Sequence, residues 1–458
     1  MTGLAGIDEE RLELFAASFS GTLLRPPDEG YAQARRIHNG LIDKSPALIA
    51  RCLNTADVID AVNMGREEGL EISVRGGGHN VAGRAVTDGG LMIDLSLMKG
   101  ILVDPEQRTV RAQGGVIWSE FNRTAASFGL AATGGEISST GIAGLTTGGG
   151  LGWLMGKYGL ALDNLISAEV VLASGDVVKA SEDSERDLFW ALRGGGGNFG
   201  IVTWFEYRVH PLSTVLGGAI LHPLPAAPAV LSNFRDLNTG TSDELTTAAA
   251  FLHAPDGSGG KLCGPALCHV GEDPDRAEGE VRPFREFGTP AADLVQRMPY
   301  PVMNTLLDPM FPAGTLNYWK SAFLSELSDA AIEVMAHAFA NSPTEMCALI
   351  IEHIHGAVTR VEPTATAFPH RQAGYSCLII SQWTDPDETD AGIAWARETF
   401  DALRPHMADR AYVNYLSADD DDRIRQAYGP NYDRLVELKQ RYDPDNLFRL
   451  NQNISPSP

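Results

Sequence analysis

The stretch Val74-Arg75-Gly76-Gly77-Gly78-His79-Asn80 follows an apolar segment and places three consecutive glycines directly before a histidine. Glycines leave the backbone bare, so its N–H groups can contact a ligand directly. The histidine at the exit of the turn is close enough to touch whatever the glycines bind. Two interpretations remain open from this stretch alone: a loop that holds a nucleotide cofactor, or an ordinary loop with a surface histidine.

Composition places the chain among ordinary globular proteins and argues against nucleic acid as a partner. At 458 residues the chain is too long for one typical core, which predicts two or three domains. Its hydrophobic fraction of 44% and charged fraction of 21% are typical of soluble proteins. The net charge of −23 repels phosphate backbones, so we expect no nucleic-acid partner.

The cysteines and the first residues predict a reduced, cytoplasmic protein without a metal site. Cys268-His269 lacks a second ligand pair at zinc-site spacing, and the other cysteines are scattered along the chain (Cys52, Cys263, Cys347 and Cys377). The segment 1–13 carries acids where a signal peptide needs basic residues, and no apolar run is long enough to span a membrane. We expect a monomer or homodimer with no membrane association.

Hydrophobic periodicity predicts an α+β chain with two main parts. The first starts with a strand–helix–strand unit over 48–74, in which Thr55 is the expected N-cap and Gly69 the C-cap. Prolines mark a boundary near 213–228, after which helices alternate with apolar strands. That alternation predicts a second domain whose antiparallel sheet is flanked by helices. The expected divisions are 1–42, 43–212, 213–407 and 408–458.

The run Gly195-Gly196-Gly197-Asn198-Phe199-Gly200 matches the G-x-G-x-x-G pattern of dinucleotide-binding folds. That fingerprint requires a strand before the glycines and a helix after them, so that phosphates lie at a helix N-terminus. Here the predicted helix over 187–193 comes first and the predicted strand over 201–209 follows. The reversed order excludes a Rossmann site.

A second glycine-rich run extends from Gly134 to Gly152 and interleaves glycines with Ser and Thr hydroxyls. Short hydroxyl donors and bare backbone suit the binding of phosphate and carbonyl oxygens. A flexible linker is the alternative. However, the apolar residues within the run and Trp153 beside it favour an ordered, cofactor-binding loop over a linker.

These two runs, with the residues that follow them, resemble the PCMH-type flavin-binding module of the vanillyl alcohol oxidase superfamily, in its berberine bridge enzyme-like branch. The resemblance covers about residues 43–212 and 411–458. Further motifs that carry it are Lys157-Tyr158-Gly159-Leu160-Ala161-Leu162-Asp163-Asn164, Asp187-Leu188-Phe189-Trp190-Ala191-Leu192-Arg193-Gly194 and Tyr442-Asp443-Pro444-Asp445-Asn446-Leu447-Phe448. It implies two α+β subdomains that clamp an FAD, a separate substrate domain, and a C-terminal segment that returns to the FAD domain.

The resemblance implies that the turn over 75–80 grips the FAD pyrophosphate and that His79 forms a covalent bond with the flavin 8α-methyl group. Such a bond raises the flavin potential and prevents loss of the cofactor. The residues expected at the cofactor are Arg75, Gly76, Gly77, Gly78, His79, Asn80, Gly83, Gly134, Gly135, Ser139, Thr140, Gly141, Gly144, Thr146, Gly149, Gly150, Gly152, Asp163, Asn164, Gly200, Ile201, Val202, Asn414, Tyr415 and Asn451.

The chain departs from the family at two positions. Many relatives carry a second covalent link through a cysteine, and alignment of the glycines places Ile137 there, with no cysteine between residues 53 and 262. We therefore predict a single covalent link at His79. Thr140 occupies a position where relatives have a small aliphatic residue thought to control oxygen access, which leaves oxidase and dehydrogenase behaviour both open.

The tail supplies candidate catalytic residues. The segment 411–415 reads as a strand, in which Tyr412 and Asn414 share one face and Tyr415 lies on the other. The resemblance implies that an Asn-Tyr pair faces the flavin and that a tyrosine acts as general base. We predict Tyr415 as the base, with Tyr412 as the second candidate. The phenol pKa of about 10 would have to be lowered by its neighbours.

The substrate side is expected on two strands of the second domain. Strand alternation places His353 and His355 of Glu352-His353-Ile354-His355-Gly356 on one face. They lack a third metal ligand, which favours a structural or substrate-contacting pair. On the next strand, Tyr375 and Gln382 are the expected substrate contacts.

We therefore predict an FAD-dependent oxidase. A small molecule or sugar would lose a hydride to the flavin from a C–H next to a hydroxyl or amine, Tyr415 would take the proton, and O₂ would reoxidise the flavin to give H₂O₂. The amine alternative resembles one branch of the family, whose single histidyl link agrees with the absent cysteine. A flavin dehydrogenase or an oxidative cyclase with another acceptor remains the alternative, as does a non-enzymatic flavoprotein.

Overall fold

The computed structural model describes residues 9–254 and 257–456, so the first eight residues used in the argument about a signal peptide lie outside it. The chain starts with a four-stranded sheet in the order β1-β2-β4-β3, in which β2 and β3 both run parallel to β4. Its elements are α1 (Glu9–Ser18), β1 (Thr22–Leu24), α2 (Tyr31–Ala34), β2 (Leu48–Arg51), α3 (Thr55–Glu67), β3 (Ile72–Arg75) and β4 (Leu91–Asp94).

The predicted strand–helix–strand unit is present, with one correction at its helix. The side chain of Asn54 accepts a hydrogen bond from the Asp57 N–H, so Asn54 is the N-cap of α3 and Thr55 is its first helical residue. Gly69 follows the helix with a φ of +64°, the left-handed conformation expected of a glycine that closes a helix.

A second sheet holds five antiparallel strands in the order β5-β6-β10-β8-β9. Helix α7 precedes the third glycine run and β10 follows it, which confirms the reversed order that excludes a Rossmann site. The elements are β5 (Ile101–Asp104), β6 (Thr109–Gln113), α4 (Trp118–Ala126), β7 (Leu130–Ala131), α5 (Ile142–Gly148), α6 (Met155–Tyr158), η1 (Ala161–Asn164), β8 (Leu165–Val171), β9 (Val177–Ser181), α7 (Arg186–Leu192), η2 (Gly196–Asn198), β10 (Ile201–Arg208) and β11 (His210–Pro211).

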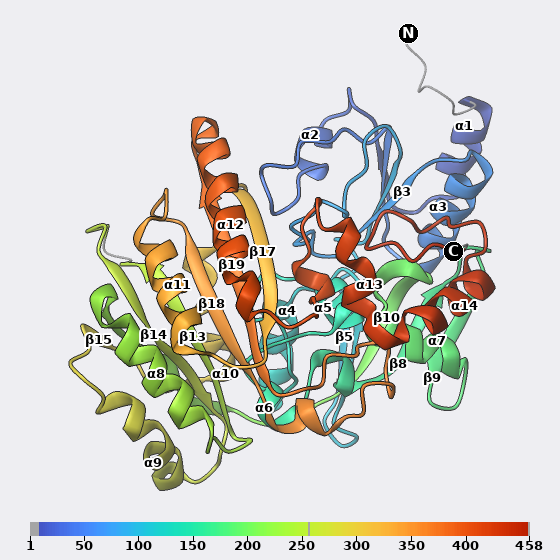
Figure 1. The fold of residues 1–458 in the computed structure, drawn as a ribbon. Helices are drawn as coiled ribbons and strands as arrows, with labels where there is room; N and C mark the ends of the chain where they lie inside the picture. Colours follow the sequence, from blue (N-terminus) through green and yellow to red (C-terminus); the bar gives the residue numbers. More distant parts are fainter. Residues whose placement is uncertain (1–8, 255–256, 457–458) are drawn as a thin grey trace.

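The third sheet is antiparallel, in the order β15-β12-β14-β13-β18-β19-β17, with β16 paired to β12. Helices cover its outer face, while its inner face looks toward the two amino-terminal sheets, as Figure 1 shows. Its elements are β12 (Thr214–Pro223), α8 (Ala227–Asn238), β13 (Leu245–His253), β14 (Lys261–His269), α9 (Pro274–Arg285), β15 (Ala292–Asp293), β16 (Gln296–Pro299), α10 (Tyr300–Met303), β17 (Leu316–Leu324), α11 (Asp329–Ala340), β18 (Ala348–Ile354), β19 (Gly374–Trp383) and α12 (Thr389–Leu403). The predicted α+β class with a helix-flanked antiparallel sheet is confirmed.

Strand alternation divides the side chains of this third sheet between two environments. On β18, Leu349 and Ile351 pack with the covering helices, whereas Ile350 joins a separate cluster on the inner face. Which side chains of β18 lie on the inner face therefore depends on which side of the sheet the helices cover.

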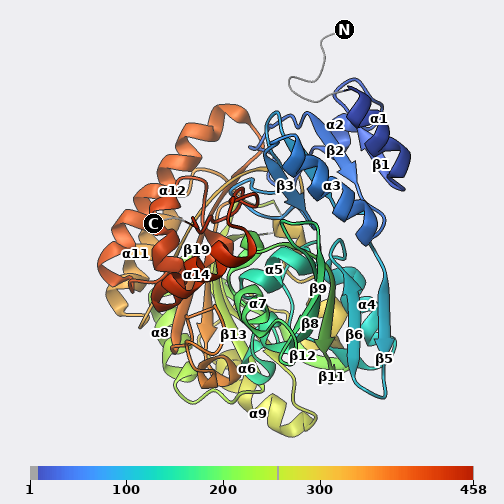
Figure 2. The same ribbon diagram turned by 90° about the vertical axis from the view of Figure 1, so that its right-hand side faces the viewer.

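The C-terminal segment crosses back to the amino-terminal half of the molecule, as Figure 2 shows. It contains η8 (Val413–Tyr415), η9 (Asp421–Arg423), α13 (Ile424–Tyr428) and α14 (Tyr432–Tyr442). Helix α14 packs on α7, where the Arg434 guanidinium lies 4.0 Å from the Trp190 ring centroid and 2.9 Å from an Asp187 carboxylate oxygen. The predicted strand over 411–415 is wrong, because its last three residues form a 3₁₀ turn.

Two further findings bear on the sequence predictions. All five cysteines are buried and unpaired. None of the helices within residues 9–254 and 257–456 combines the length and apolar character needed to cross a membrane.

Candidate active site

One large cleft, which we call the central cleft, lies where the two amino-terminal sheets, the third sheet and the C-terminal segment meet. It encloses about 1760 Å³ of space between its walls, a figure that includes the open solvent at its mouth. Its walls come from the end of β3 and the turn after it, the second glycine run, the residues around Gly200, the inner face of the third sheet, and the C-terminal tail.

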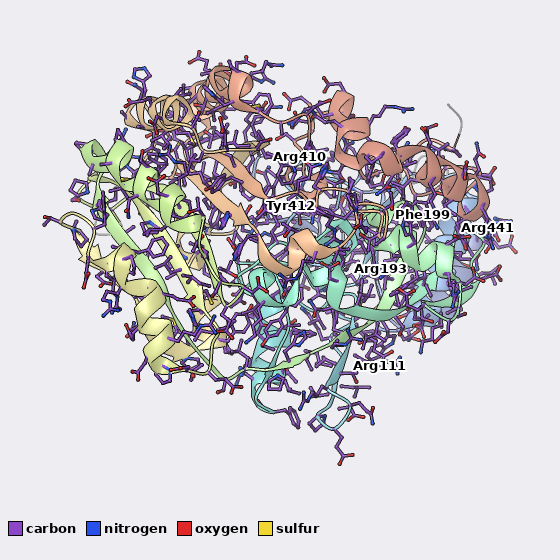
Figure 3. The ribbon with its side chains drawn as sticks, turned by 60° about the horizontal axis from the view of Figure 1, so that its bottom comes forward. Arg111, Arg193, Phe199, Arg410, Tyr412 and Arg441 are labelled. Atoms are coloured by element: carbon purple, nitrogen blue, oxygen red, sulfur yellow. The ribbon has the colours of Figure 1, made fainter. Side chains whose placement is uncertain are left out.

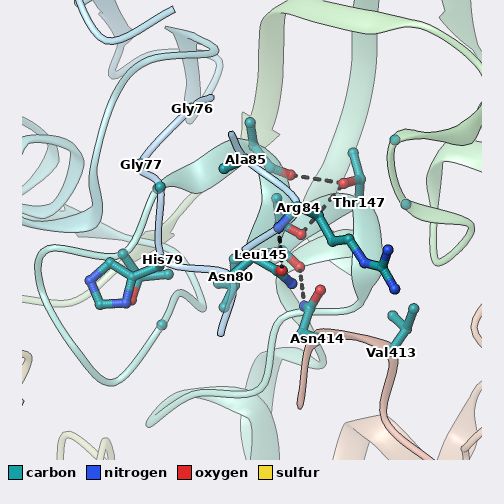
Figure 4. Close-up of a pocket in the computed structure, with 18 of the residues that line it drawn as sticks. Gly76, Gly77, His79, Asn80, Arg84, Ala85, Leu145, Thr147, Val413 and Asn414 are labelled. Atoms are coloured by element: carbon teal, nitrogen blue, oxygen red, sulfur yellow. Dashed lines mark hydrogen bonds between the residues drawn. The ribbon is translucent and has the colours of Figure 1, made fainter. Parts of the chain in front are cut away.

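The glycine turn after β3 forms one wall of the cleft and depends on bare backbone. A Cβ added to Gly77 would lie 2.4 Å from the backbone nitrogen of Gly141, so the two glycine runs cross in direct backbone contact. Gly78 has a φ of +70°, which lets the turn reverse direction before His79. Figure 4 shows this turn with His79 and Asn80, together with Asn414, which bonds to Leu145.

The importance of this backbone contact for the cleft can be tested by substitution. Gly77→Ala should weaken FAD retention by about 10–100-fold, because overpacking against rigid backbone costs about 1–3 kcal/mol. The measurement is the dissociation constant of FAD in the His79→Ala background, where no covalent bond holds the cofactor. Gly240→Ala is the matched control, since a Cβ there meets nothing within 4 Å. An unchanged dissociation constant in Gly77→Ala would contradict the role given to the crossing.

His79 lines the cleft with a neutral imidazole. Its Nε2 lies 2.7 Å from the Ser139 hydroxyl, and the ring of His38 stacks on it with centroids 3.8 Å apart. Burial and the nearby His38 lower the pKa of His79 to about 3, and burial lowers the pKa of His38 to about 4. Sequence reasoning missed His38, because only the folded chain brings it beside His79.

The central cleft brings together fifteen of the residues that were predicted at a cofactor. They come from five separate segments: Gly76, Gly77, Gly78, His79, Asn80, Gly135, Thr140, Gly141, Gly144, Gly200, Ile201, Val202, Asn414, Tyr415 and Asn451.

Arg75, which was predicted at the cofactor, instead has a structural role. Its Nε donates to Asp94 Oδ1 at 2.9 Å, and its Nη1 donates to the carbonyl of Ala34 at 2.7 Å. Asp94 is fully buried at the end of β4, the strand next to β3. The guanidinium therefore fixes the base of the turn and does not line the cleft.

The other predicted cofactor residues also lie outside the lining and serve packing. The ring of Trp118 covers Gly134, and Gly152 packs on the Gly134 carbonyl. Asp163 accepts from Arg371 Nη1 at 2.7 Å, and the Thr146 hydroxyl bonds with that of Tyr207 at 2.8 Å. The corrected set is Gly83, Gly134, Ser139, Thr146, Gly149, Gly150, Gly152, Asp163 and Asn164, of which Ser139 contacts His79 directly.

Tyr412 is an anchor for the tail, and its predicted role as a base is corrected. Its hydroxyl oxygen accepts from the Gly150 N–H at 2.8 Å and from Asn414 Nδ2 at 2.9 Å. The side chain, labelled in Figure 3, is buried and lies outside the lining of the central cleft. This anchor holds Asn414 and Tyr415 at the cleft wall.

Tyr415 lies in the cleft, but its phenol is not poised to lose a proton. Burial and the neighbouring Glu352 raise the pKa of Tyr415 well above its ordinary value, and burial raises the pKa of Tyr412 to about 12. The expectation of a lowered phenol pKa is therefore wrong. The Tyr415 hydroxyl instead donates to Glu352 Oε1 at 3.2 Å.

Glu352 is the titratable group that sequence reasoning missed. It lies on the inner face of β18, is 1% exposed, and lines the cleft. Burial raises its pKa to about 7, while hydrogen bonds from Ser376 and Tyr415 oppose that rise. Its Oε2 has no hydrogen-bond partner among the described residues. Strand alternation could have indicated Glu352, because it places this residue on the opposite face of the strand from the two histidines that follow it.

The structure places none of the four predicted substrate residues at the cleft. The third sheet turns three of them to its outer face, whereas Gln382 shares the inner-face parity of Leu378 and Ile380 but lies beyond the cleft lining. His353 and His355 do share a face, with ring centroids 4.5 Å apart, but it is the outer face, where Tyr375 also packs. Gln382 is fully buried at the end of β19 and donates to the Met310 carbonyl at 3.1 Å. None of the four lines the central cleft.

The cleft wall near Glu352 is apolar apart from a second carboxyl group. Glu136, in the second glycine run, lines the same cleft, and burial together with Glu352 raises its pKa well above the ordinary value. The surrounding side chains are Ile137, Phe311, Trp319, Ile350 and Leu378.

Comparison with known proteins identifies this arrangement. A family model for an FAD binding domain matches residues 46–181, and a "Berberine and berberine like" model matches residues 411–455. The chain is 33% identical to (R)-6-hydroxynicotine oxidase of Paenarthrobacter nicotinovorans over 96% of its own length and 97% of the relative's. The chain belongs to the berberine bridge enzyme-like FAD-linked oxidoreductases.

Two further comparisons extend over nearly the whole chain. An FAD-linked oxidoreductase of Dictyostelium discoideum is 29% identical over 96% of each chain. The solved structure of 6-hydroxy-D-nicotine oxidase from Arthrobacter nicotinovorans superposes with a TM-score of 0.88 at 32% identity, covering 96% of this chain and 99% of that one. The family resemblance drawn from the glycine runs is confirmed.

The central cleft of this family member fits FAD. The crossed glycine runs provide bare backbone that a single Cβ would block, and five separate segments with residues predicted at the cofactor line the same cleft. His79 stands beside the glycine turn, and Asn451 lies in the tail that closes the cleft.

Proposed function

We propose that this FAD-linked oxidoreductase is an oxidase that removes a hydride from a carbon next to a hydroxyl or amine of a small molecule, with O₂ as the final acceptor and H₂O₂ as its product. The observation that carries the proposal is Glu352: a buried carboxyl with a raised pKa and one unpartnered oxygen, in the cleft that fits FAD. A general base of this kind takes the proton that the hydroxyl or amine must lose.

Some of the cleft residues would bind the cofactor, and others would contact the substrate. FAD, when bound, supplies the ring system that accepts a hydride. The backbone of residues 76–80 would hold its pyrophosphate, and Asn414 and Tyr415 would lie at the flavin. We propose that residues 43–212 and 408–458 form the FAD unit, and that residues 213–407 supply the substrate wall.

Glu352 and Tyr415 act together in this proposal. The Tyr415 hydroxyl donates to Oε1 of Glu352 and fixes the carboxyl, which leaves Oε2 to meet the substrate proton. Trp319 and Phe311, whose ring centroids are 5.9 Å apart, exclude water from that end of the cleft. Tyr415 is thus a positioning residue for the base.

For the covalent link we propose His79 as its single site. Ser139 engages Nε2, which leaves Nδ1 as the nitrogen that would replace one hydrogen of the flavin 8α-methyl group, with the two electrons of the broken C–H bond taken up by oxidised FAD and then by O₂. The neutral imidazole implied by the lowered pKa keeps that nitrogen's lone pair available. Ile137 stands where a second link would need a cysteine.

The covalent link is tested by denaturing electrophoresis. Flavin fluorescence should stay with the wild-type protein band, because a covalent bond survives denaturation, and it should be lost from His79→Ala. His337→Ala, at an exposed histidine in the last turn of α11, is the matched control and should keep the fluorescence. A wild-type band without fluorescence would contradict the covalent link.

The oxidase activity is tested by O₂ consumption with a panel of alcohols, sugars and cyclic amines. We expect one class to reduce the flavin and to form one H₂O₂ for each O₂ consumed. Thr140 lines the cleft, at the position associated with oxygen access in the family. Rapid flavin reduction without reoxidation by air would contradict the oxidase and favour a dehydrogenase or oxidative cyclase.

A further inference from the structure

The imidazole of His79, which the function proposed above bonds to the flavin, is held from two directions. Its Nε2 lies 2.7 Å from the Ser139 hydroxyl. The ring of His38 lies on one of its faces, with centroids 3.8 Å apart and planes 22° apart. A flip of the His79 ring would break the serine contact, and a tilt would break the stack. The proposed function gives Ser139 a role but gives none to His38.

The segment that carries the His38 ring is itself anchored to the glycine turn. The His38 N–H donates to the carbonyl of Gly78 at 2.9 Å. The next residue, Asn39, donates from its Nδ2 to the carbonyl of Val81 at 2.9 Å. These two acceptors lie on either side of His79 along the chain. The His38 ring is therefore a fixed support for the imidazole that it covers.

His38 offers His79 the face of its ring and acts on no ligand directly. The side chain is 8% exposed, and its Nε2 has no hydrogen-bond partner among the described residues. Burial lowers the pKa of His38 to about 4, so the ring is neutral at physiological pH and does not repel a second imidazole. His79 lines the central cleft, whereas His38 does not. Any effect of His38 on the cofactor must therefore pass through His79.

The orientation of His79 matters for the covalent bond proposed there. In that step the Nδ1 lone pair bonds the flavin 8α carbon, and the C–H proton and the imidazole N–H proton are lost. The two electrons of the C–H bond pass to oxidised FAD and then to O₂, which becomes H₂O₂. Nδ1 can form the bond only while its lone pair is aligned with the carbon. Holding a reacting group in that alignment accelerates bond formation.

Resting on the proposed covalent link, we propose that His38 is a positioning residue for flavin attachment. Its ring, stacked on His79, holds the imidazole in the plane from which Nδ1 bonds the flavin. The ring face carries this role, so another flat aromatic side chain can replace the imidazole of His38.

The test follows covalent attachment separately from cofactor binding. Full-length apoprotein is purified from riboflavin-starved cells and mixed with FAD in air, and samples are denatured at intervals to measure flavin fluorescence in the protein band. His38→Ala should slow attachment by about 10–100-fold, because lost alignment of reacting groups costs rates of that order. His38→Phe keeps a flat ring and should attach flavin within about threefold of the wild-type rate.

Two controls separate orientation from general damage to the cleft. In the His79→Ala background no covalent bond can form, and adding His38→Ala there should leave the dissociation constant of FAD unchanged. His210→Ala removes another stacked imidazole, whose ring centroid lies 3.9 Å from that of Tyr158 and which does not line the cleft. This variant should keep the wild-type rate of attachment.

The proposal is overturned if His38→Ala attaches flavin at the wild-type rate. It is also overturned if His38→Phe is as slow as His38→Ala, because the imidazole nitrogens would then be required, or if FAD affinity falls as much as the rate. A wild-type band that never becomes fluorescent would remove the covalent link, and the role of His38 with it. If the wild-type and His38→Ala bands become fluorescent equally fast, the covalent link stands and only the role of His38 fails.

Discussion

Replacing Glu352 with glutamine should lower the rate constant of flavin reduction by about 10²–10⁴-fold, the contribution of a positioned general base. The amide keeps the shape of the side chain, and its oxygen can still accept the hydrogen bond from Tyr415. It cannot accept the substrate proton, because the amide nitrogen has no basic lone pair. Anaerobic stopped-flow reduction with the best donor of the panel measures the effect.

The pH profile of the wild-type enzyme should identify the same group. Burial raises the pKa of Glu352 to about 7, and the groups that face it are Tyr415, Ser376 and Glu136. Below that pKa the carboxyl is protonated and cannot act as a base. The value of kcat/KM should therefore rise with pH and level off above about 7. Glu352→Gln should lose this acid limb.

Tyr415→Phe is the matched control for the base. It removes the hydroxyl that donates to Glu352 but leaves the carboxyl in place, so the loss of rate should be much smaller than in Glu352→Gln. Because that hydrogen bond lowers the pKa of Glu352, its removal should move the acid limb to higher pH. A rate loss in Tyr415→Phe as large as in Glu352→Gln, with no shift of the limb, would make the tyrosine the base instead.

The cofactor half of the site was predictable because local sequence determines it. Consecutive glycines leave the backbone bare in any fold, because they have no side chains. The order of helix and strand around Gly195–Gly200 could be predicted from the hydrophobic periodicity of the residues on either side. These features identified the family and fifteen of the cleft residues. The Arg75 side chain could not be placed in the same way, because its partner Asp94 comes from another strand, and only the parallel pairing of β3 and β4 brings them together.

The substrate half was not predictable, because it depends on long-range packing. Strand alternation correctly paired His353 with His355, but alternation cannot say which face the helices will cover. Once α8, α11 and α12 pack on the outer face, the inner face presents Glu352. The prediction of a strand in the tail was wrong for a related reason. A 3₁₀ turn forms at Val413–Tyr415, next to the hydrogen bond that the Gly150 N–H donates to the Tyr412 hydroxyl, although the residue types favoured a strand.

The tail that completes the cofactor cleft depends on one buried ion pair. Lys439 Nζ donates to Asp443 Oδ2 at 2.7 Å, and both side chains are 0% exposed. The same ammonium also donates to the carbonyls of Asn198 at 2.8 Å and Phe448 at 2.9 Å, so each of its three N–H groups has an acceptor. Asp443 in turn accepts from the Leu447 N–H at 2.8 Å. The pair thus joins α14, the glycine run at 195–200 and the tail that lines the cleft.

Lys439→Met should therefore lower the free energy of unfolding by about 3–5 kcal/mol, the usual cost of leaving one buried charge without its partner. Methionine fills similar volume, so the loss reports the uncompensated Asp443 carboxylate and the two carbonyls, and not an empty cavity. Urea unfolding followed by tryptophan fluorescence measures the shift, and the visible spectrum of the bound flavin should change at lower urea in the variant.

The control for this loss is an exposed ion pair in the same segment. Arg425 and Asp433 lie 3.4 Å apart with side-chain exposures of 71% and 84%, so solvent already screens both charges. Arg425→Met should leave the urea midpoint and the transition of the flavin spectrum unchanged. Equal midpoints for the two variants would mean that the Lys439–Asp443 pair does not hold the tail. A large loss confined to Lys439→Met would place the stability of the cofactor cleft in this single buried pair, far from the glycines that contact the cofactor.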